Sequence, residues 1–334
     1  MSMNLKGILI DLHLHLDGSL SMETIKHLAK TQNIAIPSDV ELKKMLSVPK
    51  DCADLNEYLD KFRFPLSLLQ TKEAITYATY ALCEELANQG LMYAEIRFAP
   101  QLHTNNGLSQ TEVVRAVIKG AMKSKLHTNI ILCCMRGNNN RKENVETVIV
   151  AKKFLGKGVC ALDLAGAEGL YKTKTFDYMF RCATCSDIPM TVHCGEADGP
   201  DSIKSAVKWN PRRLGHGVRV LEDKYLMEYL AKRNIYFELC PTSNLNTKVY
   251  DSYCEYPVKK MLRNGLKVTI NTDNRTVSDT SIIDEFNHII AGNNLDANDV
   301  AVLLKNSVNA SFARKSHKKA MHKKINRMMK EATI

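Results

Sequence analysis

Two histidines near the start of the chain, His13 and His15, are separated by a single leucine. On a β-strand this spacing points both imidazoles to one face, while Leu12, Leu14 and Leu16 point to the other. Two imidazoles on one face form a natural pair of metal ligands. The pair alone is a weak signal, because histidines at this spacing also occur by chance.

A third histidine and a carboxylate follow apolar runs much later in the chain: His193 in HCGE and Asp273 in NTDN. Three imidazole nitrogens and one carboxylate oxygen suit zinc or another divalent ion of similar softness. A coordination position left for water makes such a site catalytic, because the metal lowers the pKa of that water towards about 7. We therefore expect one metal ion, held by His13, His15, His193 and Asp273.

Two further residues stand where they could move protons beside this metal. Glu196 follows His193 across the flexible Cys194-Gly195 pair, and its carboxyl group could donate or accept a proton. His216 lies between two glycines, which let substrate or water approach closely. A lone histidine in such a place is often purely structural, so His216 is a candidate only in the company of the other residues.

Short β-branched and apolar runs alternate with helical stretches, which is typical of βα units around a parallel sheet. Most runs end in polar residues, glycine or proline, as expected where the strand ends of a TIM barrel carry the chemistry. The predicted fold is an α/β TIM (β/α)8 barrel, in one domain over residues 1–334, with extra helices after the first strand. The expected strands are residues 8–16, 92–100, 129–137, 159–166, 190–196, 213–218, 236–244 and 267–274.

The segment between the first two strands, residues 17–91, is too long for one crossover and predicts several helices. Within it four apolar residues fall on one helical face: Leu55, Tyr58, Leu59 and Phe62. Core packing is the default interpretation of this face. An apolar wall or lid over a pocket is the alternative, because loops at the strand ends of a barrel are where lids lie.

The net charge of +10 is concentrated at the end of the chain, in residues 314–330. Ala313, Met321, Ile325 and Met328 or Met329 recur there at roughly helical spacing, which predicts an amphipathic helix with a solvated basic face. A nucleic-acid or anionic-surface patch is the less favoured interpretation, because no RNA- or DNA-binding signature accompanies the charge. We expect no nucleic-acid partner.

The chain has no apolar run of about 18 residues and no cleavage-like site after its first strand, so we expect neither a membrane span nor a signal peptide. Its ten cysteines are scattered through apolar runs, which favours buried, reduced thiols in a cytoplasmic protein. The one C-x-x-C pair, Cys182 and Cys185, lies in an expected helix without a second pair and is interpreted as structural.

Six motifs together resemble the adenosine deaminase family, in order and with similar spacing over nearly the whole chain. They are HLHLDGS at 13–19, DLAGAEG at 163–169, HCGE at 193–196, GHGV at 215–218, PTSN at 241–244 and NTDN at 271–274. The resemblance implies a TIM barrel with one zinc ion on His13, His15, His193 and Asp273. It implies a small purine nucleoside as substrate, and we expect a monomer or a weak homo-oligomer.

The resemblance also implies roles for single residues. Glu196 matches the proton donor to purine N1, and His216 matches the residue that positions and deprotonates the attacking water. Gly166 matches a backbone donor to N3, and Asp17 a carboxylate that contacts the ribose 5'-hydroxyl. His15 is expected to bind the metal and also to contact the substrate.

The chemistry itself requires an acid beside the ring. Attack at an aromatic amidine carbon creates a tetrahedral centre, so the neighbouring ring nitrogen must gain a proton as hydroxide adds. A neutral carboxylic acid does this, and we therefore expect burial to raise the pKa of Glu196.

One position departs from the family pattern. Many relatives carry two consecutive aspartates after the last strand, whereas here the second residue is Asn274. Its side-chain amide can donate to an acceptor such as purine N7 without needing protonation. The zinc ligand Asp273 is unaffected by this difference.

Three functions follow from these observations. The first is hydrolytic deamination of adenosine and 2'-deoxyadenosine in purine salvage. Deaminases of adenine or other 6-aminopurine compounds are the alternative, although they often carry glutamate where this chain has Asp17. A metal-free barrel that binds purines or nucleic acid is the remote alternative, because it leaves all the catalytic positions without a use.

Overall fold

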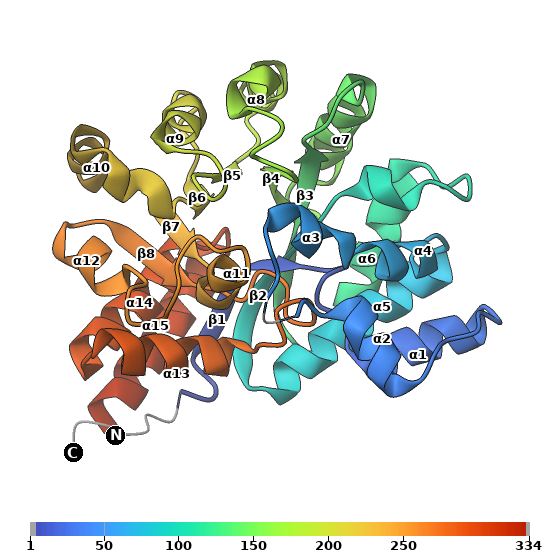
Figure 1. The fold of residues 1–334 in the computed structure, drawn as a ribbon, viewed down its shortest axis with the longest axis horizontal. Helices are drawn as coiled ribbons and strands as arrows, with labels where there is room; N and C mark the ends of the chain where they lie inside the picture. The colour runs from blue at the N-terminus through green and yellow to red at the C-terminus, as the bar shows by residue number, and fades with distance from the viewer. Residues whose placement is uncertain (1–4, 50, 332–334) are drawn as a thin grey trace.

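Eight parallel strands occupy the centre of the protein, and helices surround them (Figure 1). The computed structural model describes residues 5–49 and 51–331. The strands are β1 (Leu9–His15), β2 (Leu91–Phe98), β3 (Thr128–Met135), β4 (Val159–Ala165), β5 (Thr191–Cys194), β6 (Arg213–His216), β7 (Tyr236–Leu239) and β8 (Lys267–Ile270).

The strands pair in chain order as two four-stranded sheets, β1-β2-β3-β4 and β5-β6-β7-β8. Parallel bridges join the sheets at both seams, from Leu162 to Met190 and from Leu14 to Asp273. At the second seam the His15 amide donates to the Asp273 carbonyl at 2.8 Å, and the Asp273 amide donates to the His13 carbonyl at 2.7 Å. The eight strands thus go round a barrel, as predicted, and its closing seam puts Asp273 beside both histidines of β1.

Each expected strand overlaps an observed one, but the predicted ends are too long in places. The run 236–244 leaves the sheet at Leu239, because Pro241 begins helix α11 (Pro241–Asn246) and a proline has no N–H for a strand ladder. The run 190–196 ends at Cys194, because the next residue, Gly195, has a left-handed backbone with φ 67°.

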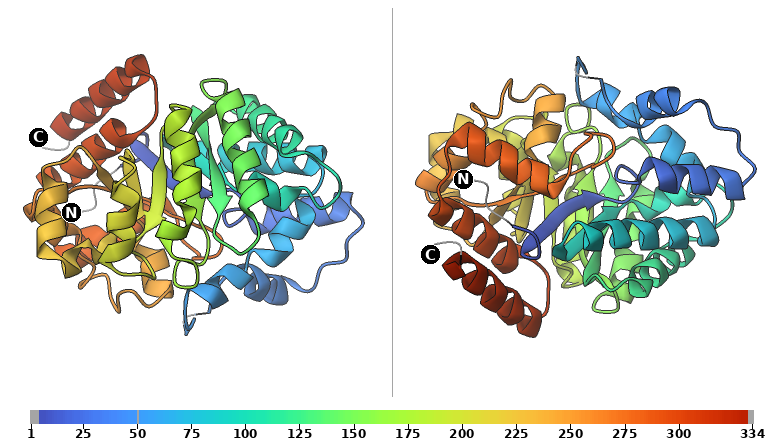
Figure 2. Two further views of the ribbon diagram at one scale, coloured as in Figure 1. Left: turned by 90° about the horizontal axis from the view of Figure 1, so that it is seen from above. Right: turned by 90° about the horizontal axis from the view of Figure 1, so that it is seen from below.

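The crossover helices form the outer layer, and side-chain caps fix where several of them begin (Figure 2). Ser109 and Glu112 form a capping box at the start of α6, and Ser281 and Asp284 form another at the start of α13. Besides α11 and the last helix, α15 (Lys315–Glu331), the α-helices after β2 are α6 (Gln110–Lys123), α7 (Arg141–Phe154), α8 (Asp177–Cys185), α9 (Pro200–Val207), α10 (Lys224–Ala231), α12 (Val258–Arg263), α13 (Ile282–Asn293) and α14 (Ala297–Ala310).

Residues 17–91 form several helices, as expected: α1 (Met22–Thr31), α2 (Asp39–Leu46), α3 (Leu55–Asp60), α4 (Arg63–Leu68) and α5 (Lys72–Asn88). The predicted single face over 55–62 is divided, because α3 ends at Asp60 and α4 begins at Arg63. Tyr58 packs with Cys52 and Val277 in a small cluster apart from the main core. All four residues of the face nevertheless line a cavity, so the alternative interpretation, an apolar wall over a pocket, is confirmed.

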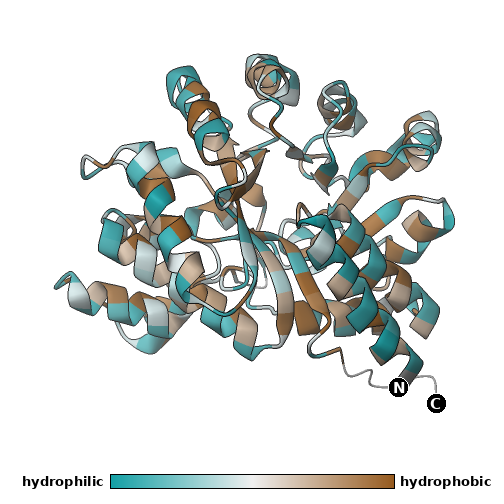
Figure 3. Ribbon diagram, turned by 180° about the vertical axis from the view of Figure 1, so that it is seen from behind, coloured by the Kyte–Doolittle hydropathy of each residue, from teal (hydrophilic) through white to brown (hydrophobic). Residues whose placement is uncertain are grey.

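The last helix, α15 (Lys315–Glu331), packs against α14. Met321 and Ile325 are buried, and Met328 and Met329 lie half-buried against the core. Seen from behind, this helix is mainly hydrophilic (Figure 3), which confirms the predicted amphipathic helix. Among the described residues, no helix is long and apolar enough to cross a membrane.

The cysteines are all unpaired, and seven of the ten are buried. Cys182 and Cys185 lie at the end of α8, in a helix as expected.

The interior of the barrel is unusually polar. Side chains that alternate outward on β1, such as Leu12 and Leu14, join the aliphatic core under the helices. The inward positions instead carry charged and imidazole side chains, which are fully buried: Asp11, His13, Glu95, Arg97, Arg213 and Glu238. Because aliphatic residues usually fill a TIM-barrel interior, this polar filling points to a site that needs buried charge.

Candidate metal and active site

The four predicted metal ligands converge at the carboxyl ends of the strands. His13 and His15 end β1, His193 lies in β5, and Asp273 follows β8. Nε2 of His15 is 3.2 Å from Nε2 of His193, and Oδ1 of Asp273 is 3.3 Å from Nε2 of His13 and 3.4 Å from Nε2 of His15. One ligand atom from each residue lies within 4.8 Å of the others. Residues distant in sequence therefore form one compact donor set.

This donor set fits a zinc ion or a similar divalent metal. Nε2 of His13 is buried and has no hydrogen-bond partner among the described residues, as expected of an atom that binds a metal. Burial, together with the charge of Arg97, lowers the pKa of His13 to about 4, and burial also holds the pKa of His15 well below its ordinary value. Metal ligation requires neutral imidazoles, and both side chains are neutral at physiological pH.

Asp273 is held ionised at the same place. Burial opposes its charge, but the close approach of the His13 and His15 imidazoles keeps the pKa of Asp273 well below its usual value. The Ser243 hydroxyl donates to its Oδ2 at 2.6 Å and leaves Oδ1 facing the imidazoles. The backbone of Asp273 is left-handed, with φ 61°, a strained conformation of the kind found at functional sites.

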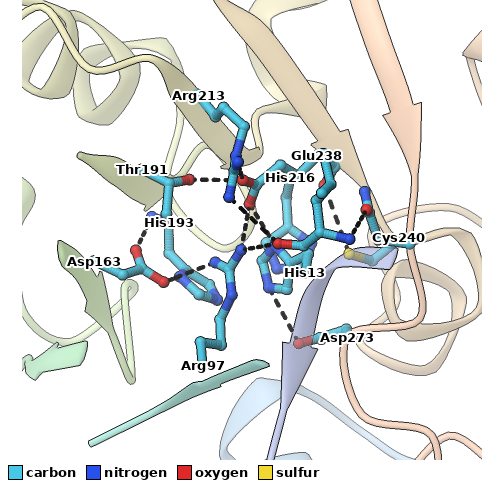
Figure 4. Close-up of polar contacts among 12 residues, drawn as sticks. His13, Arg97, Asp163, Thr191, His193, Arg213, His216, Glu238, Cys240 and Asp273 are labelled. Atoms are coloured by element: carbon cyan, nitrogen blue, oxygen red, sulfur yellow. Dashed lines mark hydrogen bonds and ion pairs between the residues drawn. The ribbon is translucent and has the colours of Figure 1, made fainter. Parts of the chain in front are cut away.

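Two buried carboxylates orient the histidine ligands from behind (Figure 4). Nδ1 of His13 hydrogen-bonds to Glu238 at 2.9 Å, and Nδ1 of His193 lies 2.9 Å from Oδ2 of Asp163. Each contact fixes the proton on Nδ1 and leaves Nε2 to bind a metal. Burial opposes a charged imidazole, but the adjacent Asp163 carboxylate raises the pKa of His193.

Arg97 links these two carboxylates, donating to Asp163 at 2.7 Å and to Glu238 at 2.8 Å. Sequence reasoning missed Asp163, Glu238 and Arg97 as supporting residues. Their signal was a charged residue inside an apolar strand, as in ALDLA and YFELC, because a charge in such a strand must find a buried partner.

Glu196 and His216 face each other beside the metal ligands. Oε2 of Glu196 is 3.6 Å from Nε2 of His216, and both residues are buried. Burial raises the pKa of Glu196, which agrees with the expectation for a carboxylic acid that donates a proton. The side-chain amide of Asn244 contacts Nδ1 of His216 at 3.1 Å, so Nε2 is the nitrogen left to face Glu196.

The glycines around His216 allow this crowding. A Cβ atom at Gly215 would lie 3.1 Å from Cε1 of His13 and 3.1 Å from Cα of His193, so a side chain there would displace the ligands. His216 itself has φ 57°, a left-handed backbone that is costly for a residue with a Cβ atom. Gly215 therefore allows the metal ligands to pack closely beside His216, and the predicted approach of substrate or water stays a prediction.

The buried carboxylate of Glu168 binds the backbone of the loop that contains Glu196. It accepts backbone N–H groups from four consecutive residues at 2.7–3.0 Å, those of Gly195, Glu196, Ala197 and Asp198. The Ser202 hydroxyl also donates to it. Glu168 lies within the DLAGAEG motif, but its structural role did not follow from the motif, because the loop that it binds begins 27 residues later.

A cavity of about 300 Å³ opens above these residues, within the size range of small-molecule sites. His13 lies beneath the cavity wall and is fully buried. The wall facing the polar residues is apolar and includes Leu59, Phe62, Leu66 and Leu102. The cavity brings together all the other predicted site residues: His15, Asp17, Gly166, His193, Glu196, His216, Asp273 and Asn274.

Three predicted substrate contacts, Asp17, Gly166 and Asn274, line this cavity, and two of them offer buried polar atoms without a partner. Oδ1 of Asp17 and Oδ1 of Asn274 are buried without a hydrogen-bond partner among the described residues, and burial raises the pKa of Asp17 to about 6. Gly166 has φ 105°, a conformation that glycine adopts without strain. Asn274 packs closely on the loop after β1, because a Cβ atom at Gly18 would lie 2.0 Å from its Oδ1.

Comparison with known proteins gives one consistent family. The adenosine deaminase family profile matches residues 9–328. Adenosine deaminase from Haemophilus ducreyi is 45% identical over 322 residues, which cover 93% of this chain and 94% of that protein. The enzyme of the same name from Clostridium kluyveri is 39% identical over 325 residues, covering 94% of this chain and 93% of that protein.

The fold of a solved structure agrees with this assignment. The crystal structure of an adenine deaminase from Arthrobacter aurescens superposes with a TM-score of 0.86 and 25% sequence identity, covering 97% of this chain and 99% of that one. The six motifs and the family profile thus cover the same residues and the same barrel. The chain belongs to the adenosine deaminase family.

Proposed function

We propose that this protein hydrolyses adenosine and 2'-deoxyadenosine to inosine and 2'-deoxyinosine, with release of ammonia, in purine salvage. The main support for this proposal is the cavity in which three imidazoles and a carboxylate converge beside a buried pair, Glu196 and His216. Relatives named adenosine deaminase, identical at up to 45% of aligned positions, support the same reaction.

The proposed cofactor is one zinc ion on His13, His15, His193 and Asp273. The support is chemical: nitrogen and carboxylate donors in this number are typical of catalytic zinc, and two buried carboxylates orient the imidazoles. When bound, the metal supplies Lewis-acid activation of the attacking water.

The protein's own residues then move the protons. In the proposed reaction the water oxygen bonds to purine C6, and His216 takes one of the water's protons. Glu196, whose pKa is raised by burial, is the proposed acid and gives its proton to N1 as the ring loses aromaticity. The C6–N bond to the amino group then breaks as His216 gives its proton to the leaving nitrogen, which departs as ammonia. The proton of the new C6 hydroxyl passes to Glu196, which leaves a C6 carbonyl and restores both side chains.

The proposed substrate contacts surround the same cavity. The Gly166 backbone donates to N3, the Asn274 amide donates to N7, and Asp17 accepts from the 5'-hydroxyl. His15 adjoins the substrate as well as the metal. The apolar wall formed by Leu59, Phe62 and Leu66 would exclude water from the bound purine and strengthen the polar contacts.

The decisive experiment follows adenosine by its ultraviolet absorbance, which falls on conversion to inosine. We expect turnover that a chelator abolishes and zinc restores. Parallel assays with adenine separate the two substrate classes, because activity on adenine without activity on adenosine would move the protein to the second class. Absence of both activities in zinc-loaded protein would contradict the proposal.

The remaining expectations stay predictions. They are a single domain over 1–334, a cytoplasmic location, a monomeric or weakly associated state and no nucleic-acid partner. The unpaired cysteines support a reducing compartment. Light scattering would test the oligomeric state, and cell fractionation would test the cellular location.

A further inference from the structure

A buried array of charged side chains extends from the metal ligands towards the amino end of the barrel (Figure 4). Glu238 accepts from His13 at 2.9 Å and from Arg97 at 2.8 Å, and Arg213 donates to its other oxygen. Nη2 of Arg213 lies 2.7 Å from Oε2 of Glu95. All five side chains are fully buried, so Glu95 is connected to a metal ligand through two intermediate residues.

The far end of this array is sealed by the C-terminal part of the chain. Oε1 of Glu95 accepts the Tyr93 hydroxyl at 2.7 Å and the Phe312 amide at 2.6 Å. The Phe312 ring covers the Arg213 guanidinium, whose carbon lies 4.1 Å from the ring centroid. The Ala310 carbonyl accepts from Arg213 at 3.2 Å. Water is therefore kept from Glu95 and Arg213, and their charges act over a longer range than they would in solvent.

The charges of the array do not cancel. The array and the metal ligands together contain two guanidinium groups, of Arg97 and Arg213, and four carboxylates. Two negative charges therefore remain. A divalent cation at the ligand set would balance this excess. The four carboxylates are Glu95, Asp163, Glu238 and Asp273.

Glu95 is the carboxylate most remote from the ligands, yet it determines how Arg213 shares its charge. With Glu95 present, Arg213 is divided between two carboxylates. Without that negative charge, the whole guanidinium would act on Glu238. Glu238 would then attract the Nδ1 proton of His13 less strongly, and a less basic imidazole is a weaker metal ligand.

We propose that Glu95 is a positioning residue for the metal centre, whose negative charge, acting through Arg213 and Glu238 on His13, strengthens the binding of a divalent cation. This inference rests on the proposed metal site. It assigns a role in metal binding to a residue of β2 that does not line the cavity. It also makes the backbone of residues 310–312 part of the support of the metal centre.

The test is the zinc affinity of the folded protein, measured by competition with a chelator of known affinity. Glu95→Gln keeps the shape and the two hydrogen bonds at the Oε1 position, but it removes the charge and places an NH2 group where Oε2 faces Arg213. We expect zinc to bind about tenfold more weakly, at the lower end of effects from outer metal-site residues. Glu95→Asp keeps the charge and should restore most of the affinity. Tyr93→Phe is the matched control, because it removes a hydrogen bond to the same carboxylate and leaves its charge.

Wild-type zinc affinity in folded Glu95→Gln would overturn the inference, and so would an equal loss in Tyr93→Phe, since that would indicate disturbed packing. If Glu95→Gln folds only with metal, the zinc concentration at half-refolding replaces the competition assay. It should then be about tenfold higher than for Glu95→Asp, and equal concentrations would contradict the role. A wild-type protein that binds no zinc would instead refute the metal site itself, so the two failures are distinguishable.

Discussion

Glu196 and His216 approach within 3.6 Å, Oε2 to Nε2, from the ends of the adjacent strands β5 and β6. Both are buried, and Oε1 of Glu196 has no hydrogen-bond partner among the described residues. A protonated carboxyl and an imidazole in this arrangement can serve one reacting carbon, with the acid beside the ring nitrogen and the imidazole beside the attacking oxygen.

Replacing the proposed acid should remove most of the activity without harming the fold. Glu196→Gln keeps the volume and can still donate a hydrogen bond, but it cannot transfer a proton to N1. We expect kcat for adenosine to fall by about 10²–10⁴-fold, the usual contribution of a general acid. Steady-state kinetics give the loss, and metal analysis and thermal unfolding should match the wild type.

Glu228→Gln is a suitable control, because Glu228 is half exposed on α10 and pairs with Lys224 at the surface. It should leave kcat unchanged. If Glu196→Gln retained near-normal turnover, another group would have to protonate the ring.

Asn274 should make purine recognition independent of pH at N7. A side-chain amide donates at every pH, whereas a carboxyl donates only when it is protonated. Asn274→Asp should therefore lower kcat/KM for adenosine, and the loss should grow as pH rises and reach about tenfold, corresponding to one hydrogen bond of about 1.4 kcal/mol. Parallel pH profiles of the variant and the wild type measure this effect.

The substrate analogue 7-deazaadenosine provides the control for this contact. It has no acceptor at position 7, so the variant and the wild type should use it with similar kcat/KM at each pH. A variant that discriminates against adenosine and the analogue equally would show that Asn274 does not contact N7.

The apolar wall should contribute to binding rather than to the chemical step. Phe62 lines the cavity beside His15, with the two ring centroids 6.5 Å apart. Phe62→Ala should raise KM about tenfold with a small change in kcat, because it removes apolar contact made equally in the ground and transition states. Phe64→Ala, two residues away and packed on the core instead, should alter stability more than KM.

The strand ends were predictable because alternation on a strand is a local property. The spacing of His13 and His15 was enough to place both on one face. The network behind them was not predictable, because Glu238, Arg213 and Glu95 meet only when β2, β6 and β7 come together in the barrel. A charged residue in an apolar strand predicts that a buried partner exists, but it does not identify which residue is the partner.

Helix boundaries in the cavity wall were less predictable for a related reason. The spacing of Leu55, Tyr58, Leu59 and Phe62 fits one helix, and only the tertiary contacts decide that α3 ends at Asp60. The same spacing suits a core face and a cavity wall equally well. The choice between them depends on whether other side chains or a cavity lie opposite this face, and a local sequence pattern does not show this.

A buried carboxyl away from the metal site should affect stability through pH. Glu285 is fully buried, accepts from the Thr242 amide at 3.1 Å and from the Thr280 hydroxyl at 2.8 Å, and burial raises its pKa from 4.5 to about 8. Between these two values the folded state keeps a proton that the unfolded state has lost. The free energy of unfolding should therefore fall as pH rises from about 5 to 8, by up to about 1.4 kcal/mol per pH unit from this group.

Glu285→Gln cannot titrate, so it should remove this component of the slope. Urea unfolding of the two proteins at several pH values between about 5 and 8 measures the difference, which should be largest at the alkaline end, where the wild type has lost most. Glu228→Gln, at an exposed position on α10, is the control and should keep the wild-type slope. Identical slopes in all three proteins would mean that Glu285 is already ionised at neutral pH, and that the two hydrogen bonds from Thr242 and Thr280 are enough to hold its charge inside the protein.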